Sequence, residues 1–369
     1  MERAHRLDPA LGAVAVAGSV MYALASSIRA QGDRFVAIAF VVMVTVGLAG
    51  IVSSETGASF TGASTNPGNT LTAMLVQPPA SQGVPISSAG GVVSLSWTTT
   101  PTAPGAGHTL TYVVLRGPVG GPYTQITSVS GLSYTDTPPT DGTYQYVIQA
   151  RVSGGGSFTS QNSVAQSGIS DRLAPSMSIT CNGAACSGTA WYTAAVSVTV
   201  TGTDAGSGMG SVTRNVDGAG QVSTTGASAT FSVSGDSANH SVVYFGTDAV
   251  GNTSGSSTQT LKIDGTPPPA AALSGFRFGT LQGDVTLTWT QSADATSGVA
   301  TFDVYKKNIS GSGAACGTTG FTVARTGLAS GVTNTVVNVG NNAWACFYLI
   351  TKDNAGNQTQ SNIVKVQGL

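Results

Sequence analysis

The amino-acid sequence predicts an all-β protein with three tandem β-sandwich domains that follow an N-terminal transmembrane (signal) helix. From Leu71 onward, apolar and polar residues alternate with the period of two that half-buried strands require. The chain contains 49 Gly, which favour turns. Only 8% of its residues are Asp, Glu, Lys or Arg, against about 25% in an ordinary soluble domain. Glu and Lys are common surface helix formers, so this composition disfavours long helices.

An apolar run at residues 35–52 carries no charge over 18 residues. As a helix it would span about 27 Å, close to the hydrocarbon thickness of a bilayer. Arg29 and Arg34 precede it, which predicts that residues 1–34 stay on the cytoplasmic side. The run is therefore interpreted as a transmembrane helix or as the apolar core of a signal peptide.

A second uncharged stretch, residues 11–28, is dominated by Ala, Gly and Ser. Either it forms an extra membrane helix, or the true start is Met21 and the preceding residues are not translated. Because this stretch is only weakly hydrophobic, a single membrane segment at residues 35–52 is favoured.

Residues 53–69 are predicted to be a linker with a cleavage site. The segments at residues 56–61 (TGASFT) and 66–73 (NPGNTLTA) resemble the start of bacterial precursors cut by the SipW-type signal peptidase, among them biofilm-matrix fibre subunits. The resemblance implies cleavage after Ala58. The sequence departs from that pattern at Gly62, where an acidic residue is common. If cleavage occurs the protein is secreted; otherwise the helix anchors the β-domains outside the cell membrane.

Two segments, residues 70–170 and 267–369, share the same strand signals. Three alternating strands recur in the same order: Val93–Trp97 and Val285–Trp289, Tyr112–Arg116 and Phe302–Lys306, Tyr144–Ala150 and Phe347–Thr351. Self-similarity of this kind indicates a tandem array. Trp97, Tyr112 and Tyr146 make the first segment resemble a fibronectin type III domain, and the second segment resembles one through the shared strand signals. The resemblance implies sandwiches of about seven strands.

The middle segment, residues 174–264, carries different signals: an Asp-x-x-Ser-Gly turn at Asp204, a Val-Asp-Gly hairpin at Asp217 and an Asp-x-x-Gly-Asn ending at Asp248. It resembles bacterial immunoglobulin-like modules. The Asp-x-x-Gly-Asn ending recurs at Asp353, so it is interpreted as a shared hairpin device. Pro175 and the Pro267–Pro269 run are expected to mark stiff linkers.

The four cysteines predict two disulfides, Cys181–Cys186 and Cys316–Cys346, since an even count in an exported chain favours bridges. Buried free thiols are the alternative. A zinc site is disfavoured, because a second pair of ligands is missing near either pair of cysteines.

Sequence motifs for catalysis were not found, and the protein is predicted not to be an enzyme. His108 and His240 fall in different predicted domains, and His240 is expected to be exposed just before a strand. The chain has neither a Gly-x-Ser-x-Gly elbow nor a phosphate-binding loop. A stripe of Lys and Arg is also missing, so nucleic acid is not an expected partner, and no cofactor is predicted.

Two weaker binding features remain. Asp204, Asp217, Asp248 and Asp264 are candidate calcium ligands, although each can equally cap its own turn. Trp191 and Tyr192 are candidate sugar-stacking aromatics, although such a pair is more often a core or edge element.

The expected function is that of a non-enzymatic cell-surface or secreted structural or adhesive protein that presents tandem β-sandwich modules. The alternatives are a carbohydrate-binding accessory protein of the cell envelope and a matrix fibre component. Expected partners are the membrane, through the N-terminal helix, and cell-wall polysaccharide, matrix or host surface proteins. The ligand and the oligomeric state are left open by the sequence.

Overall fold

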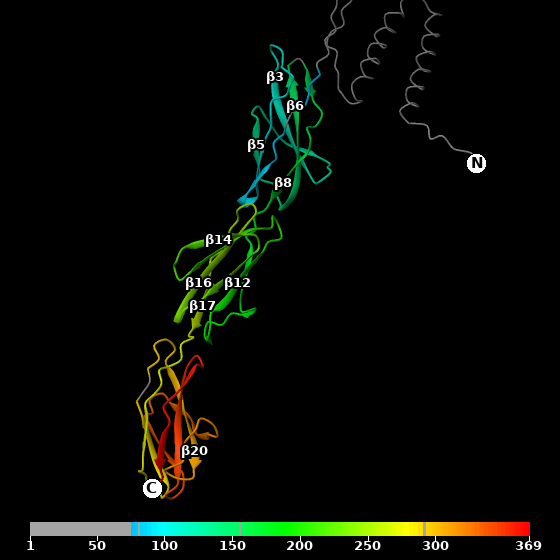
Figure 1. The fold of residues 1–369 in the computed structure, drawn as a ribbon. Helices are drawn as coiled ribbons and strands as arrows, with labels where there is room; N and C mark the ends of the chain where they lie inside the picture. The colour runs from blue at the N-terminus through cyan, green and yellow to red at the C-terminus, as the bar shows by residue number, and fades with distance from the viewer. Residues whose placement is uncertain (1–74, 80–81, 155, 291–292) are drawn as a thin grey trace, which may run out of the picture. The chain divides into compact units, whose positions relative to one another are not determined.

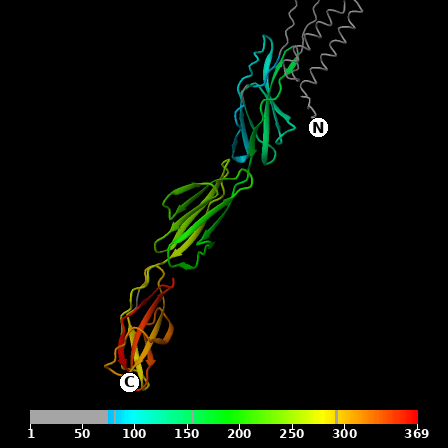
Figure 2. The same ribbon diagram turned by 45° about the vertical axis from the view of Figure 1, so that its right-hand side comes forward.

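A computed structural model describes residues 75–79, 82–154, 156–290 and 293–369 (Figures 1 and 2). These residues form strands β1 to β25 and one 3-10 turn, η1 (Ala89–Gly91). The all-β prediction is confirmed. Within the described ranges, no helix is long and apolar enough to cross a membrane. The predicted membrane segments at residues 11–28 and 35–52 and the predicted cleavage site after Ala58 lie outside these ranges.

The strands form six sheets, and each successive third of the described chain contributes two of them. The chain also divides into two compact units. One consists of the described residues up to Ile86 together with residues 94–136 and 143–168, and the other of residues 87–93, 137–142 and 169–369.

The first pair of sheets contains three strands in the order β1-β2-β5 and four in the order β4-β3-β6-β7, with β8 pairing to β6. The strands are β1 (Ile86–Ser88), β2 (Val92–Ser96), β3 (Thr109–Gly117), β4 (Thr124–Val129), β5 (Ser133–Asp136), β6 (Gly142–Ser153), β7 (Ser157–Thr159) and β8 (Gln166–Ser170). Trp97 and Tyr112 are both buried, with ring centroids 5.7 Å apart. Tyr146 and Ile148 on β6 are fully buried, and Val147 between them is buried as well, so burial does not alternate in this part of the strand.

A buried ion pair lies in this sandwich. Arg116 on β3 donates to both carboxylate oxygens of Asp136, at 3.2 and 2.9 Å, and the Tyr146 hydroxyl donates to the same carboxylate at 2.9 Å. Asp136 is 5% exposed and Tyr146 is fully buried. Burial, followed by the hydrogen bond to Asp136, raises the pKa of Tyr146 far above its usual value. The phenol therefore stays protonated and serves as a permanent donor to Asp136.

The second pair of sheets has the orders β10-β9-β12-β15 and β11-β17-β16-β13-β14. The strands are β9 (Ser176–Cys181), β10 (Ala184–Ala185), β11 (Trp191–Tyr192), β12 (Val196–Thr203), β13 (Met209–Val216), β14 (Gln221–Thr225), β15 (Ser228–Val233), β16 (Ser237–Asp248) and β17 (Ser257–Ile263). Val196, Val198 and Val200 of β12 are fully buried in its core, whereas Ser197 between them is exposed. Strand β11 runs parallel to β17.

The third pair of sheets repeats the arrangement of the first. Its orders are β18-β19-β22 and β21-β20-β23-β24, with β25 pairing to β23. The strands are β18 (Leu273–Phe276), β19 (Asp284–Trp289), β20 (Val299–Ile309), β21 (Thr322–Ala329), β22 (Asn334–Asn338), β23 (Trp344–Asp353), β24 (Gln358–Gln360) and β25 (Val364–Gln367). Trp289 and Phe302, the counterparts of Trp97 and Tyr112, lie 5.5 Å apart in the core. The repeat that the sequence shows is therefore a repeat of strand order as well.

Two hairpin turns adopt the conformation that their sequences predict. Asn182 and Gly183 both have positive φ, 51° and 78°, and so do Asp217 and Gly218, at 51° and 75°. Asn, Asp and Gly tolerate this conformation better than other residues, so they suit tight hairpin turns. The first turn joins β9 to β10, and the second joins β13 to β14.

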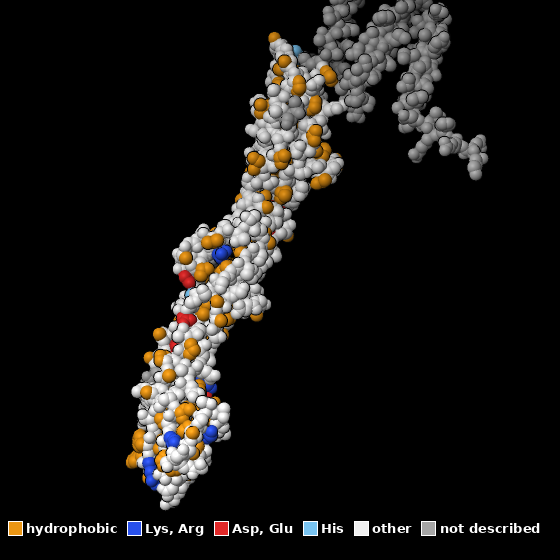
Figure 3. Space-filling model, in the orientation of Figure 1, with side chains coloured by type: hydrophobic (Ala, Val, Ile, Leu, Met, Phe, Trp, Pro, Cys, Tyr) orange, Lys and Arg blue, Asp and Glu red, His pale blue; other side chains and the backbone are white. Residues whose placement is uncertain are grey.

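Charged side chains are sparse on the surface. The face in Figure 3 is mostly backbone and uncharged polar atoms, with hydrophobic side chains scattered over it and Lys, Arg, Asp or Glu at a few places only. This agrees with the low charged fraction of the sequence, 8%.

Candidate functional site

Two groups of three aspartates bring carboxylate oxygens within 4.8 Å of one another, and they are the candidate metal-binding residues of the described chain. The first group is Asp171, Asp204 and Asp248. Asp171 directly follows β8, Asp204 follows β12, and Asp248 ends β16. Asp171 is fully buried and Asp248 is 3% exposed.

Asp204 and Asp248 cap the turns in which they lie. One oxygen of Asp204 accepts the backbone N–H groups of Gly206 and Gly208, at 3.1 and 2.8 Å. One oxygen of Asp248 accepts three successive backbone N–H groups, those of residues 250, 251 and 252, at 2.6–3.0 Å. These hydrogen bonds are the turn-capping role that the sequence left open beside calcium binding.

Asp171 links the two capped turns. Its carboxylate accepts the N–H groups of Ser207, at 2.7 Å, and of Leu173, at 3.0 Å. Its backbone carbonyl accepts the side-chain amide of Asn252 at 3.0 Å. Burial acts to raise the pKa of Asp171, but the hydrogen bonds from Ser207 and Leu173 outweigh it and hold the pKa below the usual value. Asp171 is therefore ionised at neutral pH.

The second group, Asp264, Asp294 and Asp353, repeats this arrangement. Asp264 accepts the N–H group of Ser297 at 3.1 Å, and its carbonyl accepts the Asn357 amide at 2.8 Å. One oxygen of Asp294 accepts the N–H groups of Ser297 and Gly298, and one oxygen of Asp353 accepts those of Gly356 and Asn357. Each residue thus has a counterpart in the first group.

The sequence analysis named Asp204, Asp248 and Asp264 together as candidate calcium ligands, without assigning them to separate sites. The structure puts Asp264 in a different group from the other two. Asp171, Asp294 and Asp353 were missed as group members. Asp294 could have been found, because residues 294–298 (DATSG) repeat the Asp-x-x-Ser-Gly pattern of residues 204–208 (DAGSG).

Each group supplies one oxygen from each of three carboxylates. Calcium takes six to eight oxygen ligands, so backbone carbonyls or water would have to supply the rest. The turns are already organised by the protein's own N–H donors, with the capping bonds at Asp248 and Asp353 as short as 2.6–2.7 Å. The local fold of both groups therefore rests on hydrogen bonds that need no ion.

A substitution in the second group should show the strength of these bonds. Asp353→Ala removes the acceptor of the Gly356 and Asn357 N–H groups and of the Asn357 side-chain amide at a site that is 3% exposed. Because buried donors without partners are costly, the free energy of unfolding should fall by about 3 kcal/mol. Denaturation in a buffer that contains a chelator would measure this loss without any contribution from a bound cation.

Asp236→Ala is the matched control. Its carboxylate also accepts a backbone N–H, that of Gly265 at 2.8 Å, but it is exposed to solvent. Water can replace an exposed acceptor, so a much smaller loss is expected. Equal losses in the two variants would contradict the argument that burial makes the loss of the Asp353 acceptor costly.

Asp217, the remaining calcium candidate, belongs to neither aspartate group. It lies in the β13–β14 turn, where its oxygens contact the ring of His240 at 2.7 Å and accept the N–H group of Ser241 at 2.7 Å. The prediction that His240 is exposed just before a strand is wrong, because the residue lies within β16 and is only 7% exposed. Polar neighbours in sequence suggested exposure, but two turns cover the ring.

The two histidines that the sequence named lie in different compact units, and each contacts a backbone carbonyl oxygen. His240 contacts Asp217 through Nδ1 and the Gly235 carbonyl through Nε2, at 2.9 Å, so neither ring nitrogen is available to a nucleophile. His108, in the other compact unit, contacts the carbonyl of Ala106 through Nδ1 at 3.2 Å.

Trp191 and Tyr192 lie on β11 with their side chains half-buried. Tyr192 packs against the core, and its hydroxyl accepts the N–H group of Ser187 at 3.2 Å. Lys262 places its ammonium group 5.6 Å from the centre of the Trp191 ring. One face of Trp191 is thus in contact with a cation and Tyr192 points inward, so the two rings do not form a common platform.

A second aromatic group, missed by the sequence reasoning, lies on the outer face of the last sandwich. Tyr305 and Tyr348 stack with ring centroids 4.8 Å apart, and Phe321 packs against Tyr348 at the same distance. The register pairs Tyr305 with Tyr348 directly across β20 and β23. Tyr305 and Tyr348 are stacked at an interplanar angle of 12°, so each ring covers one face of the other.

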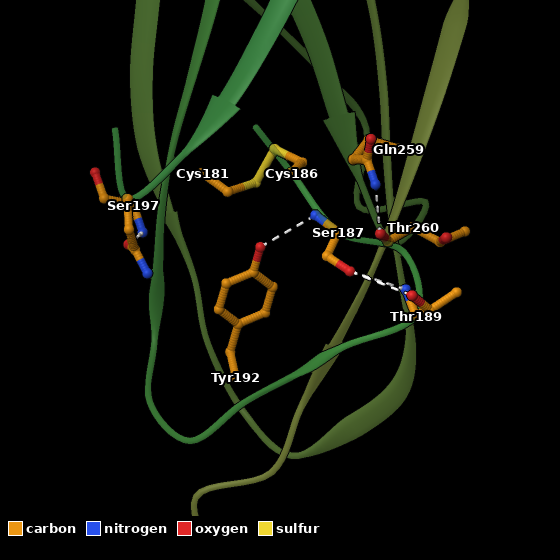
Figure 4. The surroundings of a disulfide bond; sticks show 9 residues. Cys181, Cys186, Ser187, Thr189, Tyr192, Ser197, Gln259 and Thr260 are labelled. Carbon is orange, nitrogen blue, oxygen red and sulfur yellow. Dashed lines mark hydrogen bonds between the residues drawn. A yellow bond between two sulfur atoms is a disulfide. The ribbon is translucent and has the colours of Figure 1, made fainter. Parts of the chain in front are cut away.

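Both predicted disulfides are confirmed. Cys181 is bridged to Cys186 and Cys316 to Cys346, and these are all four cysteines of the chain. Figure 4 shows the first bridge above the ring of Tyr192, beside the bond between the Tyr192 hydroxyl and Ser187. Cys346 is fully buried on β23, so the second bridge ties the segment around Cys316 to the sheet.

Comparisons with known proteins give structural similarity alone. Neither a protein-family model nor a curated protein matches the chain. Among solved structures, the FN1–FN3 domains of chicken CNTN1 match with a TM-score of 0.28 and 13% identity, over 79% of this chain and 98% of that one. A set of domains from titin matches with a TM-score of 0.36 and 14% identity, over 79% and 96%.

Proposed function

We propose that the protein is an exported structural or adhesive protein of the cell surface or the surrounding matrix, without enzymatic activity, and that its β-sandwiches present loops to partners. The observation that carries this proposal is the bridging of all four cysteines. Disulfides form and persist in oxidising compartments outside the cytosol. The apolar run at residues 35–52 would direct the chain to such a compartment.

The aspartate groups and the histidines support a structural role. The carboxylates of Asp248 and Asp353 accept hydrogen bonds from backbone N–H groups of their own turns. Both ring nitrogens of His240 are in contact with acceptors. A catalytic group must be available to a substrate. These polar residues instead organise the turns.

Export can be tested on the protein that cells release. The exported fraction is expected to contain the disulfides Cys181–Cys186 and Cys316–Cys346 and to begin near Ser59, as cleavage of a SipW-type precursor implies. Non-reducing digestion with mass spectrometry, together with N-terminal sequencing, measures both. Retention of residues 35–58 in a membrane fraction would replace cleavage by anchoring. Recovery of the whole chain in the cytosol with free thiols would contradict export.

The alternative proposal is a carbohydrate-binding accessory protein of the cell envelope. A matrix fibre component would be one form of the structural role proposed above. Binding of cell-wall polysaccharide would have to use the edges of Trp191 or the outer aromatic group of Tyr305 and Tyr348. A glycan array probed with the full chain, with Trp191→Ala and Tyr305→Ala as variants, separates these from a purely structural role. Saccharide binding that either variant abolishes would favour the alternative.

A further inference from the structure

His240 lies where strand β16 meets two turns. The residue is 7% exposed. Nδ1 is 2.7 Å from a carboxylate oxygen of Asp217, in the turn between β13 and β14. Nε2 is 2.9 Å from the carbonyl oxygen of Gly235, in the turn between β15 and β16. One side chain therefore connects two turns that are distant in sequence.

Both partners of the ring are hydrogen-bond acceptors. A backbone carbonyl has no proton to donate, and an ionised carboxylate accepts only. A neutral imidazole carries one N–H group and can satisfy one of these partners, whereas the imidazolium carries two and can satisfy both. The charged form of His240 therefore fits this geometry better than the neutral form, because only the imidazolium can donate to both acceptors.

We infer that His240 is a pH-sensitive clamp: as an imidazolium it holds the β13–β14 and β15–β16 turns together, and loss of one proton releases the β15–β16 turn. The remaining proton is expected on Nδ1, because a hydrogen bond to the charged Asp217 is stronger than one to the Gly235 carbonyl. Nε2 then presents a lone pair to the carbonyl oxygen, and the two repel each other.

The charged groups around the ring are few. Asp217 is the carboxylate that contacts it, and this residue also accepts the N–H group of Ser241. On β17 the residue paired with His240 is Leu261, which is uncharged. The next residue, Lys262, has its ammonium group over the Trp191 ring. Asp236 follows Gly235, but its carboxylate accepts hydrogen bonds from residues 265 and 266.

The bonds of Asp236 extend the effect beyond the turn. One oxygen of Asp236 accepts the Gly265 N–H at 2.8 Å, and the other accepts the Thr266 hydroxyl. Both donors lie in the segment that follows β17. Release of the β15–β16 turn would therefore loosen the attachment of this segment as well.

The pKa shifts agree with the geometry. Burial acts to lower the pKa of His240, but the Gly235 carbonyl and the Asp217 carboxylate outweigh it and raise the pKa above 6.5. A raised pKa in the folded state means that the clamp contributes its full stability below pH 6.5 and loses it as the pH rises through the higher folded value.

Asp217 has the opposite dependence. Burial acts to raise its pKa, but the Ser241 N–H and His240 hold the pKa below 3.8. Its contribution is therefore present above pH 3.8 and is lost only as the pH falls through the lower folded value. The clamp is expected to be strongest in mildly acidic solution, between these two limits.

The test is a pH titration of the full chain, labelled with ¹⁵N at histidine and followed by NMR of the ring nitrogens. The chain has only three histidines, and His240→Gln assigns the signal by its disappearance. Both nitrogens of His240 are expected to remain protonated to a higher pH in the folded chain than in the same chain unfolded by denaturant. A folded-state midpoint for His240 at or below that of the unfolded chain would overturn the inference.

A second readout separates a clamp from a passive buried histidine. The hydrogen-exchange protection factor of the Gly265 amide should fall through the same midpoint as the ring titrates, because that amide donates to Asp236. Asp217→Asn should lower the His240 midpoint, and His108→Gln should leave both readouts unchanged. Protection at Gly265 that does not follow the titration would refute the release step. Both measurements on the unsubstituted chain decide the matter even if a variant fails to fold.

Discussion

Replacing Cys316 and Cys346 together by alanine should lower the free energy of unfolding of the last sandwich by about 3–4 kcal/mol. The bridge joins residues 30 positions apart, so its loss frees a long loop in the unfolded chain. Hydrogen exchange of the core amides of β23 reports on this sandwich by itself. Lys307, which donates to the carbonyls of Cys316 and Thr319, should keep part of the segment in place.

The other disulfide provides the matched control. Cys181 and Cys186 are five positions apart, and the short loop predicts a loss of about 2 kcal/mol for the double alanine variant. The Asn182-Gly183 turn already holds the two strands together in the folded state. A loss at 181–186 equal to or larger than that at 316–346 would contradict the loop-length argument.

Asp136→Ala should destabilise the first sandwich by about 3–5 kcal/mol. The substitution leaves the guanidinium of Arg116, whose side chain is 19% exposed, without its carboxylate, and the buried Tyr146 hydroxyl without its acceptor. An uncompensated charge in such a place costs more than the pair contributed by forming. Chemical denaturation followed by fluorescence of Trp97, compared with a Trp97→Phe background, measures the change.

Asp141→Ala is the control for the loss of stability expected of Asp136→Ala. Asp141 pairs with Arg172 at 2.6 Å, but about a third of each side chain is exposed. Water and salt screen such a pair, so the expected loss is about 0–1 kcal/mol. If both aspartate variants lost the same stability, burial of the Arg116–Asp136 pair would not be the cause of the larger effect.

Strand positions could be predicted well because alternation is a local property. Val196, Val198 and Val200 alternate with polar residues in the sequence and alternate between core and surface in the structure. The hairpin turns at Asn182 and Asp217 could be predicted for the same reason, since positive φ depends on the residue itself. The short disulfide follows directly from the first of these turns.

The aspartate groups could be predicted only in part. Asp204 and Asp248 carry recognisable turn motifs, but Asp171 has no motif around it and joins them through the N–H group of Ser207 and the side chain of Asn252. Asp171 is separated from these residues by 33 to 81 positions. Pairing of β12, β13 and β16 with their neighbours brings them together, and a local pattern contains no information about that pairing.

The sequence by itself predicted the all-β class, the repeat of the first and last sandwiches and the pairing of the cysteines, because strand patterns are local and each pair of cysteines falls within one predicted domain. Only the tertiary structure decided that His240 is buried between two acceptors and that six aspartates form two groups. Burial and charge are set by what lies across a sheet or a turn, and that neighbour is chosen by the fold of the whole chain.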